Sequence, residues 1–171
     1  IHWNSVALEL MVDPGPIIES RAFAIFHAAI HDAVNGVDRR YKPYTADVSS
    51  PGASVEAAVA TAAHDVLISF SPSQRDKIEA EYLAALAAIP DGPAKTAGVA
   101  LGRKCAQANL DRRANDGIPL GPWPPTQGPI TLPVYVPTGK PGDYDFTPPF
   151  DRAPLGPIAL FPGWGHLTPF G

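Results

Sequence analysis

The sequence predicts an all-α fold, in which a bundle of about four helices is followed by an irregular segment. Over residues 1–117, apolar side chains recur at intervals of three and four, the pattern of helices that bury one face. Over residues 118–171 the composition changes, because this segment holds 14 of the 21 prolines and eight of the 15 glycines. Proline is excluded from helix interiors and from central strands. We therefore expect one domain, residues 1–171, in which an extended proline-rich segment wraps over a helical core.

The helix expected at residues 16–37 is the centre of this core. Pro16 suits the first turn of a helix, and Gly36 suits a C-terminal cap. At 1.5 Å per residue this helix is roughly 33 Å long, which is enough to cross a small domain. Its apolar stripe consists of Ile18, Ala22, Ile25, Phe26, Ala29, Ala33 and Val37.

The neighbouring segments continue the helical pattern. A short helix is expected over residues 3–12, where the side chain of Asn4 is a candidate N-cap for the unpaired backbone donors. Residues 38–52 contain Pro43, Ser49-Ser50, Pro51 and Gly52, which is typical of a surface loop. An alanine-rich helix is then expected over residues 54–69.

The next helix start is predicted by residues 71–74, with the sequence Ser-Pro-Ser-Gln. They match a capping box, in which serine caps the helix, proline occupies its first position and glutamine bonds back to the serine backbone. This helix is expected to end at Ile89. Its inward side chains should be Ile78, Tyr82, Leu83 and Leu86.

The last expected helix covers residues 93–116 and is ended by Gly117. Gly98, Gly102 and Ala106 lie four residues apart and therefore share one face. Small residues on one face let another helix approach closely, and the central helix is the expected neighbour. Cys105 lies beside this face and is predicted to be a buried, inert thiol.

Composition excludes several classes of partner. A net charge of −4 and a pI near 5.6 argue against nucleic acids and anionic membrane surfaces, which attract basic proteins. No apolar run is long enough to span a bilayer. The single cysteine excludes an internal disulfide. The sequence begins with Ile1 instead of methionine, as in a processed chain, which slightly favours a secreted or periplasmic location.

Large aromatic residues distinguish the proline-rich segment from a solvated linker. We expect Trp123, Trp164 and Phe170 to pin this segment to the helices, and Trp3 to be a further aromatic anchor. The two tryptophans of the segment could instead line a ligand groove. Anchoring is the simpler interpretation, because buried aromatic rings supply large contact areas.

The histidines of the central helix suggest a metal site. His27 and His31 lie four residues apart and share a helix face, as in two-histidine zinc sites. His64 and Asp65 would add ligands if the two long helices pack together. The chain lacks the glutamate of a metalloprotease motif, so we favour a structural alternative and predict no metal. In this alternative His27 bonds a backbone carbonyl or Asp65, and His31 is partly exposed.

Ionisable residues on the apolar helices are the other candidates for a site. Arg21, Asp32, Asp65 and Asp116 could form acid–base machinery. We favour buried pairs that fix the helix register, because an internal charge must be paired or hydrogen-bonded. His27 belongs to the same predicted set of buried polar residues.

Four stretches, taken together, resemble a known family. They are Trp3-Asn4; Arg21 with His27-Ala28-Ala29 and Asp32-Ala33-Val34; Arg113 with Asp116-Gly117; and Trp164-Gly165 with Pro169-Phe170. In this order and spacing they resemble the N-terminal helical half of the vanadium-dependent haloperoxidases, relatives of the type 2 phosphatidic acid phosphatases. The resemblance covers the whole chain but under half of a family member. His31 departs from the pattern, because relatives often carry tyrosine there.

The resemblance implies an all-α enzyme that binds vanadate and oxidises bromide or chloride with hydrogen peroxide. In the phosphatase branch it implies cleavage of a phosphate ester. In the family, lysines and arginines clamp the oxyanion beside a Pro-Ser-Gly-His stretch, and a later histidine binds vanadium. This sequence contains neither that stretch nor the family's histidine–arginine spacing. No catalytic, cofactor-binding or metal residue is therefore assigned, and vanadate is expected in the C-terminal half.

Two classes of function follow. In the first, the chain is the N-terminal structural half of a vanadate-dependent peroxidase, inactive alone, or half of an acid phosphatase of the same superfamily. In the second, it is a standalone helical binding or scaffold module. The expected partner is the C-terminal half of the same protein or a second copy of the chain, because the apolar stripes would otherwise be exposed.

Overall fold

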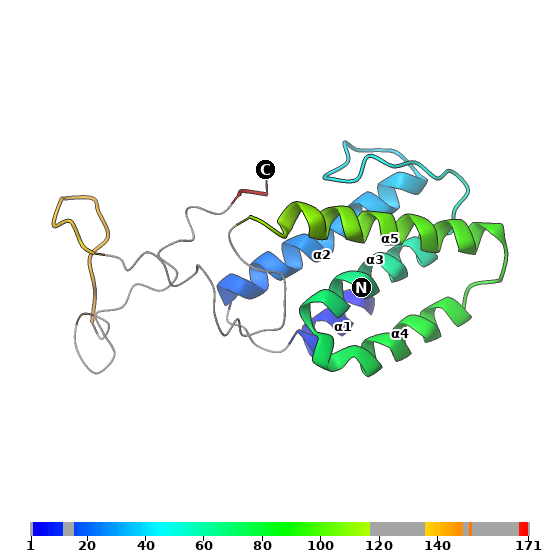
Figure 1. Ribbon diagram of the computed structural model, residues 1–171, viewed down its shortest axis with the longest axis horizontal. Helices are drawn as coiled ribbons and strands as arrows, with labels where there is room; N and C mark the ends of the chain where they lie inside the picture. Colours follow the sequence, from blue (N-terminus) through cyan, green and yellow to red (C-terminus); the bar gives the residue numbers. More distant parts are fainter. Residues whose placement is uncertain (1, 12–15, 117–135, 149–150, 152–167, 171) are drawn as a thin grey trace. The chain divides into compact units, whose positions relative to one another are not determined.

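The computed structural model describes residues 2–11, 16–116, 136–148, 151 and 168–170. Within these residues it is helical and contains no strand, which confirms the predicted all-α fold (Figure 1). The elements are α1 (His2–Leu10), α2 (Pro16–Val37), α3 (Val55–Phe70), the 3₁₀ turn η1 (Pro72–Gln74), α4 (Arg75–Ala87) and α5 (Pro93–Arg113). None of these helices is both long enough and apolar enough to cross a membrane.

The chain divides into two compact units. The helical unit comprises Ile1–Asn115 and Pro119–Thr126, and the second unit comprises Asp116–Ile118 and Gln127–Gly171. Most of the proline-rich segment, residues 118–171, lies outside the described residues. Its expected position over the helices therefore stays a prediction.

Helix α3 is at the centre of the helical unit. It contacts α2, α4 and α5, and α2 and α5 also contact each other. Alanine supplies much of the α3 surface at these contacts, and small side chains let the neighbouring helix axes approach closely. The α3 residues with no solvent exposure are Ala57, Ala58, Thr61, Ala62, Ala63, Val66 and Leu67.

Glycines on α5 allow its close approach to α3. A Cβ atom added at Gly98 would overlap the carbonyl oxygen of Ser54, and one added at Gly102 would overlap that of Ala58. The stripe of small residues therefore predicts a helix–helix contact correctly. The expected partner is wrong, however: these glycines lie against α3 and not against the central helix α2. The run of alanines that matches them is on α3.

Helix α2 has the predicted bounds, with Pro16 as its first residue. Gly36 is not a C-terminal cap as expected, because it lies inside α2 and is buried. A Cβ atom there would lie 2.9 Å from the Cδ1 atom of Leu101 and 3.2 Å from the carbonyl oxygen of Val48. The glycine therefore makes room for α5 and for the loop that follows α2.

Two predicted N-caps are wrong. Asn4 lies inside α1, which begins two residues earlier at His2. The side chain of Ser71 makes no capping hydrogen bond, because this residue already closes α3 by donating its backbone N–H to Leu67. Residues 72–74 form the turn η1, and the next helix, α4, begins after them at Arg75. At Ser54, by contrast, the hydroxyl accepts the backbone N–H of Ala57 at 3.1 Å and caps α3.

Helix α4 buries less of its surface than predicted. Its buried residues are Ile78 and Tyr82, which lie four positions apart on one narrow stripe. Leu83 is 56% exposed, so the expectation that it faces inward is wrong. The reason is that α4 packs mainly against one helix, α3, and a single contact covers only one side of it.

The described part of the second unit contains a tight turn near Lys140. The hydroxyl of Thr138 donates to the carboxylate of Asp143, and the backbone N–H of Asp143 donates to the carbonyl oxygen of Lys140 at 3.1 Å. The rings of Tyr144 and Phe146 then meet edge to face, with centroids 6.1 Å apart. These contacts are local, as expected for a segment in which proline prevents regular structure.

We predict that Gly102→Ala destabilises the helical unit, although alanine is the better helix former. The added methyl group would overlap the carbonyl oxygen of Ala58 and force α5 away from α3. Such overpacking typically costs about 1–3 kcal/mol. Urea denaturation measures the change in the free energy of unfolding. The matched control is Lys104→Ala on the exposed side of α5. An equal or higher stability for Gly102→Ala would contradict the close packing.

Candidate functional site

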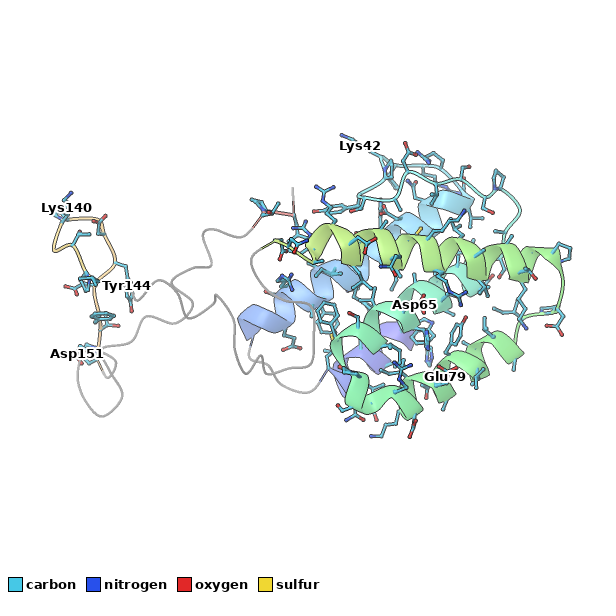
Figure 2. All side chains as sticks on the ribbon, viewed as in Figure 1. Lys42, Asp65, Glu79, Lys140, Tyr144 and Asp151 are labelled. Carbon is cyan, nitrogen blue, oxygen red and sulfur yellow. The ribbon has the colours of Figure 1, made fainter. Side chains whose placement is uncertain are left out.

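A histidine lies between two carboxylates where α3 meets α4. The Nδ1 atom of His64 is 2.8 Å from Oδ1 of Asp65, and its Nε2 atom is 2.8 Å from Oε2 of Glu79. The side chain of His64 is only 13% exposed. Asp65 and Glu79 are labelled in Figure 2, on α3 and α4 respectively. Both ring nitrogens are therefore hydrogen-bonded, Nδ1 within α3 and Nε2 across to α4.

Neighbouring side chains fix the orientation of this ring. The ring of Tyr82 stacks on it with centroids 4.2 Å apart and an interplanar angle of 25°. The hydroxyl of Tyr82 lies 3.1 Å from Oγ1 of Thr61, which itself donates to the carbonyl oxygen of Ala57. On the other side, Nε of Arg103 lies 3.8 Å from Oδ2 of Asp65. Residues from α3, α4 and α5 thus surround the histidine.

The surroundings of His64 favour its protonated form. Burial of the ring lowers the pKa of His64, but the hydrogen bonds and negative charges of Asp65 and Glu79 outweigh this effect, so the pKa is raised. In the protonated ring both nitrogens donate, one to each carboxylate. Neither nitrogen is then free to accept a proton from a substrate. The His64–Glu79 bond thus clamps α4 to α3.

A second polar cluster is centred on Asp32 of α2, which is 1% exposed. Its carboxylate accepts the backbone N–H groups of Tyr44 at 2.6 Å, Thr45 at 2.9 Å and Ala46 at 2.8 Å. It also accepts a hydrogen bond from Nδ2 of Asn109 on α5 at 3.1 Å. Asp32 is thus paired with N–H donors, whereas the sequence predicts pairing with another charged side chain.

Asn35, one turn further along α2, extends this cluster. Its Oδ1 atom accepts the backbone N–H groups of Arg40 and Tyr41 at 2.9 Å, and its Nδ2 atom donates to the carbonyl oxygen of Tyr41 at 2.7 Å. The backbone N–H of Ser50 donates to the carbonyl oxygen of Gly36 at 2.7 Å. The predicted surface loop after α2 is therefore fixed to the helix by side chains of that helix.

The structure places the other predicted buried charges as follows. Arg21 on α2 is 2% exposed, and its Nη2 atom donates to the carbonyl oxygen of Arg113 at 3.2 Å. Arg113 and Asp116 are also buried. Asp65 is half-buried beside His64.

His27 is exposed, so the expectation that it is buried is wrong. The apolar stripe of α2 that packs against the core lies on another side of the helix.

His31 is half-buried, which confirms its expected partial exposure, whereas the contacts of His27 differ from those predicted. The ring of His27 stacks against that of Phe23 with centroids 6.0 Å apart. It is His31 that lies near a backbone carbonyl, with its Nε2 atom 3.3 Å from the oxygen of Lys42. Asp65 bonds His64, its neighbour in the sequence. In the described part of the chain, no three histidine, cysteine or carboxylate side chains are placed to hold a metal ion.

Cys105 of α5 is buried, as predicted. Burial of the thiol, and secondarily the charge of Asp32, raise the pKa of Cys105 to about 12. The thiolate is the reactive form of cysteine, so this side chain is inert at neutral pH. It behaves as a small apolar residue of the core.

The predicted aromatic anchors are only partly described. Trp3 is buried in α1, and Phe170 is half-buried in the second unit. Trp123 and Trp164 lie outside the described residues, so their roles stay predictions.

Three residues of these clusters escape the sequence analysis: Glu79, Asn35 and Asn109. A usable signal exists for Asn35. Asp32 and Asn35 are polar residues one turn apart at the end of an apolar helix, immediately before a loop whose backbone N–H groups need acceptors. Glu79 carries no such signal, because a glutamate on an amphipathic helix normally faces solvent.

Comparisons with protein families, with curated proteins and with solved structures find no match to this chain. The clusters described above are therefore interpreted from their own geometry.

We predict that Asp32→Ala destabilises the helical unit by about 2–4 kcal/mol, because three backbone N–H groups, that of Ala46 buried and those of Tyr44 and Thr45 partly buried, would lose their acceptor. Chemical denaturation measures this value. Asp32→Asn is the informative companion variant, since its amide nitrogen would face N–H donors and restore only part of the stability. Asp38→Ala is the control, because this exposed carboxylate bonds only the exposed Arg40. A loss below about 0.5 kcal/mol for Asp32→Ala would contradict the anchoring role.

Proposed function

We propose that this chain is the helical structural half of a vanadium haloperoxidase-like protein, and that it has no activity of its own. The resemblance rests mainly on α2, with Arg21, the His27-Ala28-Ala29 stretch and Asp32. What supports a structural role is the use of these charges. Asp32 bonds backbone N–H groups of the following loop, and Arg21 bonds a backbone carbonyl of α5.

The described residues do not fit an oxyanion such as vanadate. Binding of a vanadate or phosphate group needs several fixed cationic donors that converge on one point. The two buried arginines, Arg21 and Arg113, are joined by a bond from the first to the main-chain carbonyl of the second. The exposed His27 stacks on an aromatic ring. We therefore assign oxyanion binding and chemistry to a separate half of the protein and derive no catalytic step here.

The outer side of α2 supports the presence of a further packing partner. Phe23 and Ile30 are half-buried, His27 is exposed and Val34 is 39% exposed, although three of the four are apolar. Their spacing of three and four residues places them on one stripe, apart from the stripe that contacts α3 and α5. A helix that is apolar on most of its sides is typical of the interior of a larger protein. We propose that helices of the vanadate-binding half cover this stripe.

The activity test compares the native protein with the isolated chain. The native protein should have a mass greater than that of these 171 residues, bind vanadate stoichiometrically and oxidise bromide with peroxide. The isolated chain should do neither, because the part of it that the structure describes holds no converging cations. Intact-mass spectrometry, calorimetry with vanadate and a bromination assay provide the readouts. Vanadate binding by the isolated chain, or a native protein without vanadate, would contradict the proposal.

The isolated chain should also form dimers at micromolar concentration, because the outer stripe of α2 would otherwise contact water. Sedimentation measures the association. Val34→Glu should abolish it, whereas Leu83→Glu, which alters an equally apolar exposed residue on α4, should not. A wild-type chain that stays monomeric would favour the alternative function, a standalone helical binding module.

A further inference from the structure

Helix α4 is attached to the rest of the helical unit by few apolar contacts. Of its 13 residues, only Ile78 and Tyr82 are buried. Leu83 of this helix faces solvent. Its apolar contribution to docking is therefore small compared with that of the other long helices.

Polar contacts with histidines supply much of the remaining attachment. Within the described residues, two ion pairs join α4 to other helices, and both use a histidine. His64 of α3 bonds Glu79, and Nε2 of His2 on α1 lies 3.3 Å from Oε2 of Glu81. Tyr82 adds its stacking contact with His64. By contrast, Arg75 and Lys77, in the first turns of α4, make no ion pair with another helix within the described residues.

We propose that α4 is a pH-controlled element, which docks on α3 when His64 is protonated and is released when His64 loses its proton. The protonated ring donates one hydrogen bond to Asp65 and one to Glu79. Loss of a proton to solvent leaves a single N–H for two carboxylates. One nitrogen lone pair then faces a carboxylate oxygen 2.8 Å away, which is repulsive.

The charges around His64 determine which bond is lost. Asp65 is adjacent in sequence on the same helix, and it is also near the guanidinium of Arg103 on α5. Glu79 comes from α4 and, in the described residues, has no arginine or lysine partner. Tyr82, the other titratable residue of α4 in contact with the ring, stacks on its face and makes no hydrogen bond to either carboxylate. The single remaining N–H can stay with Asp65 within α3, so the bond that fails is the one that holds α4.

The direction of the pH effect follows from linkage. With α4 docked, burial of the ring lowers the pKa of His64, but Asp65 and Glu79 raise it more, and docking of α4 supplies the carboxylate of Glu79. The stabilisation is fully present below the ordinary histidine value of about 6.5, and it is lost as the pH rises through the raised value. Helix α4 is therefore held at acidic pH and loosened at alkaline pH. Release uncovers Ile78, Tyr82 and the surface of α3 around Thr61.

Hydrogen exchange with mass spectrometry tests the proposal on the full chain. Protection of α4 amides is measured at about pH 5.5 and about pH 8.5, on either side of the titration of histidine, after correction for the intrinsic pH dependence of exchange. Protection in α4 should fall about tenfold or more, the effect of losing one hydrogen bond to a charged group. Protection in α2 and α5 should change little and serves as the internal reference.

Three variants separate the clamp from general effects of pH. His64→Gln should remove the pH dependence and leave α4 weakly protected at both pH values. Glu79→Gln should also remove it but keep α4 docked, because an amide can donate to the neutral ring or accept from the protonated one. His31→Gln, which alters a histidine on α2 near the loop carbonyl of Lys42, should leave the pH dependence unchanged. Equal protection of α4 at both pH values in the wild type, or persistence of the dependence in Glu79→Gln, would overturn the proposal.

Discussion

The carboxylate of Asp32 is the interaction on which the arrangement of α2, α5 and their connecting loop depends. A buried carboxylate is costly unless its oxygens accept hydrogen bonds, and buried backbone N–H groups are costly unless they find acceptors. One side chain removes both costs, because it accepts from three consecutive backbone N–H groups and from Asn109 of α5. Such a group fixes the register between a helix and a loop, which apolar contacts alone define poorly.

The packing of α3 against α5 follows a different principle. Gly98 and Gly102 let backbone meet backbone, and the alanines of α3 keep the opposing surface flat. The contact is thus specified by missing side chains, whereas the α2 cluster is specified by polar ones. These two kinds of contact meet at α5, where Cys105 and Asn109 lie one turn apart on the buried side. Substitutions at either end of α5 therefore act on different partners.

The sequence predicts the helices better than it predicts their partners. Apolar periodicity and Pro16 place α2 correctly, because these signals are local to the helix. The neighbour of Gly98 is mispredicted, since the central helix and α3 are both rich in alanine and the sequence carries no pairing information. The role of Asp32 is mispredicted for a related reason: charge complementarity points to a side chain such as Arg21, whereas the sequence shows that a loop follows Asp32 but not that its backbone N–H groups turn toward the carboxylate. The burial of His27 is mispredicted because helical spacing alone does not say which of two apolar stripes faces the core.

The same physical chemistry gives the two ionisable clusters opposite characters. The partners of Asp32 are mainly backbone N–H groups, which do not titrate. The partners of His64 are carboxylates, and its bonds need a proton that histidine loses near neutral pH. A fold can therefore keep α2, α3 and α5 fixed while the attachment of α4 varies. The position of the titratable group, between a helix with an extensive core and one with two buried residues, decides which element responds.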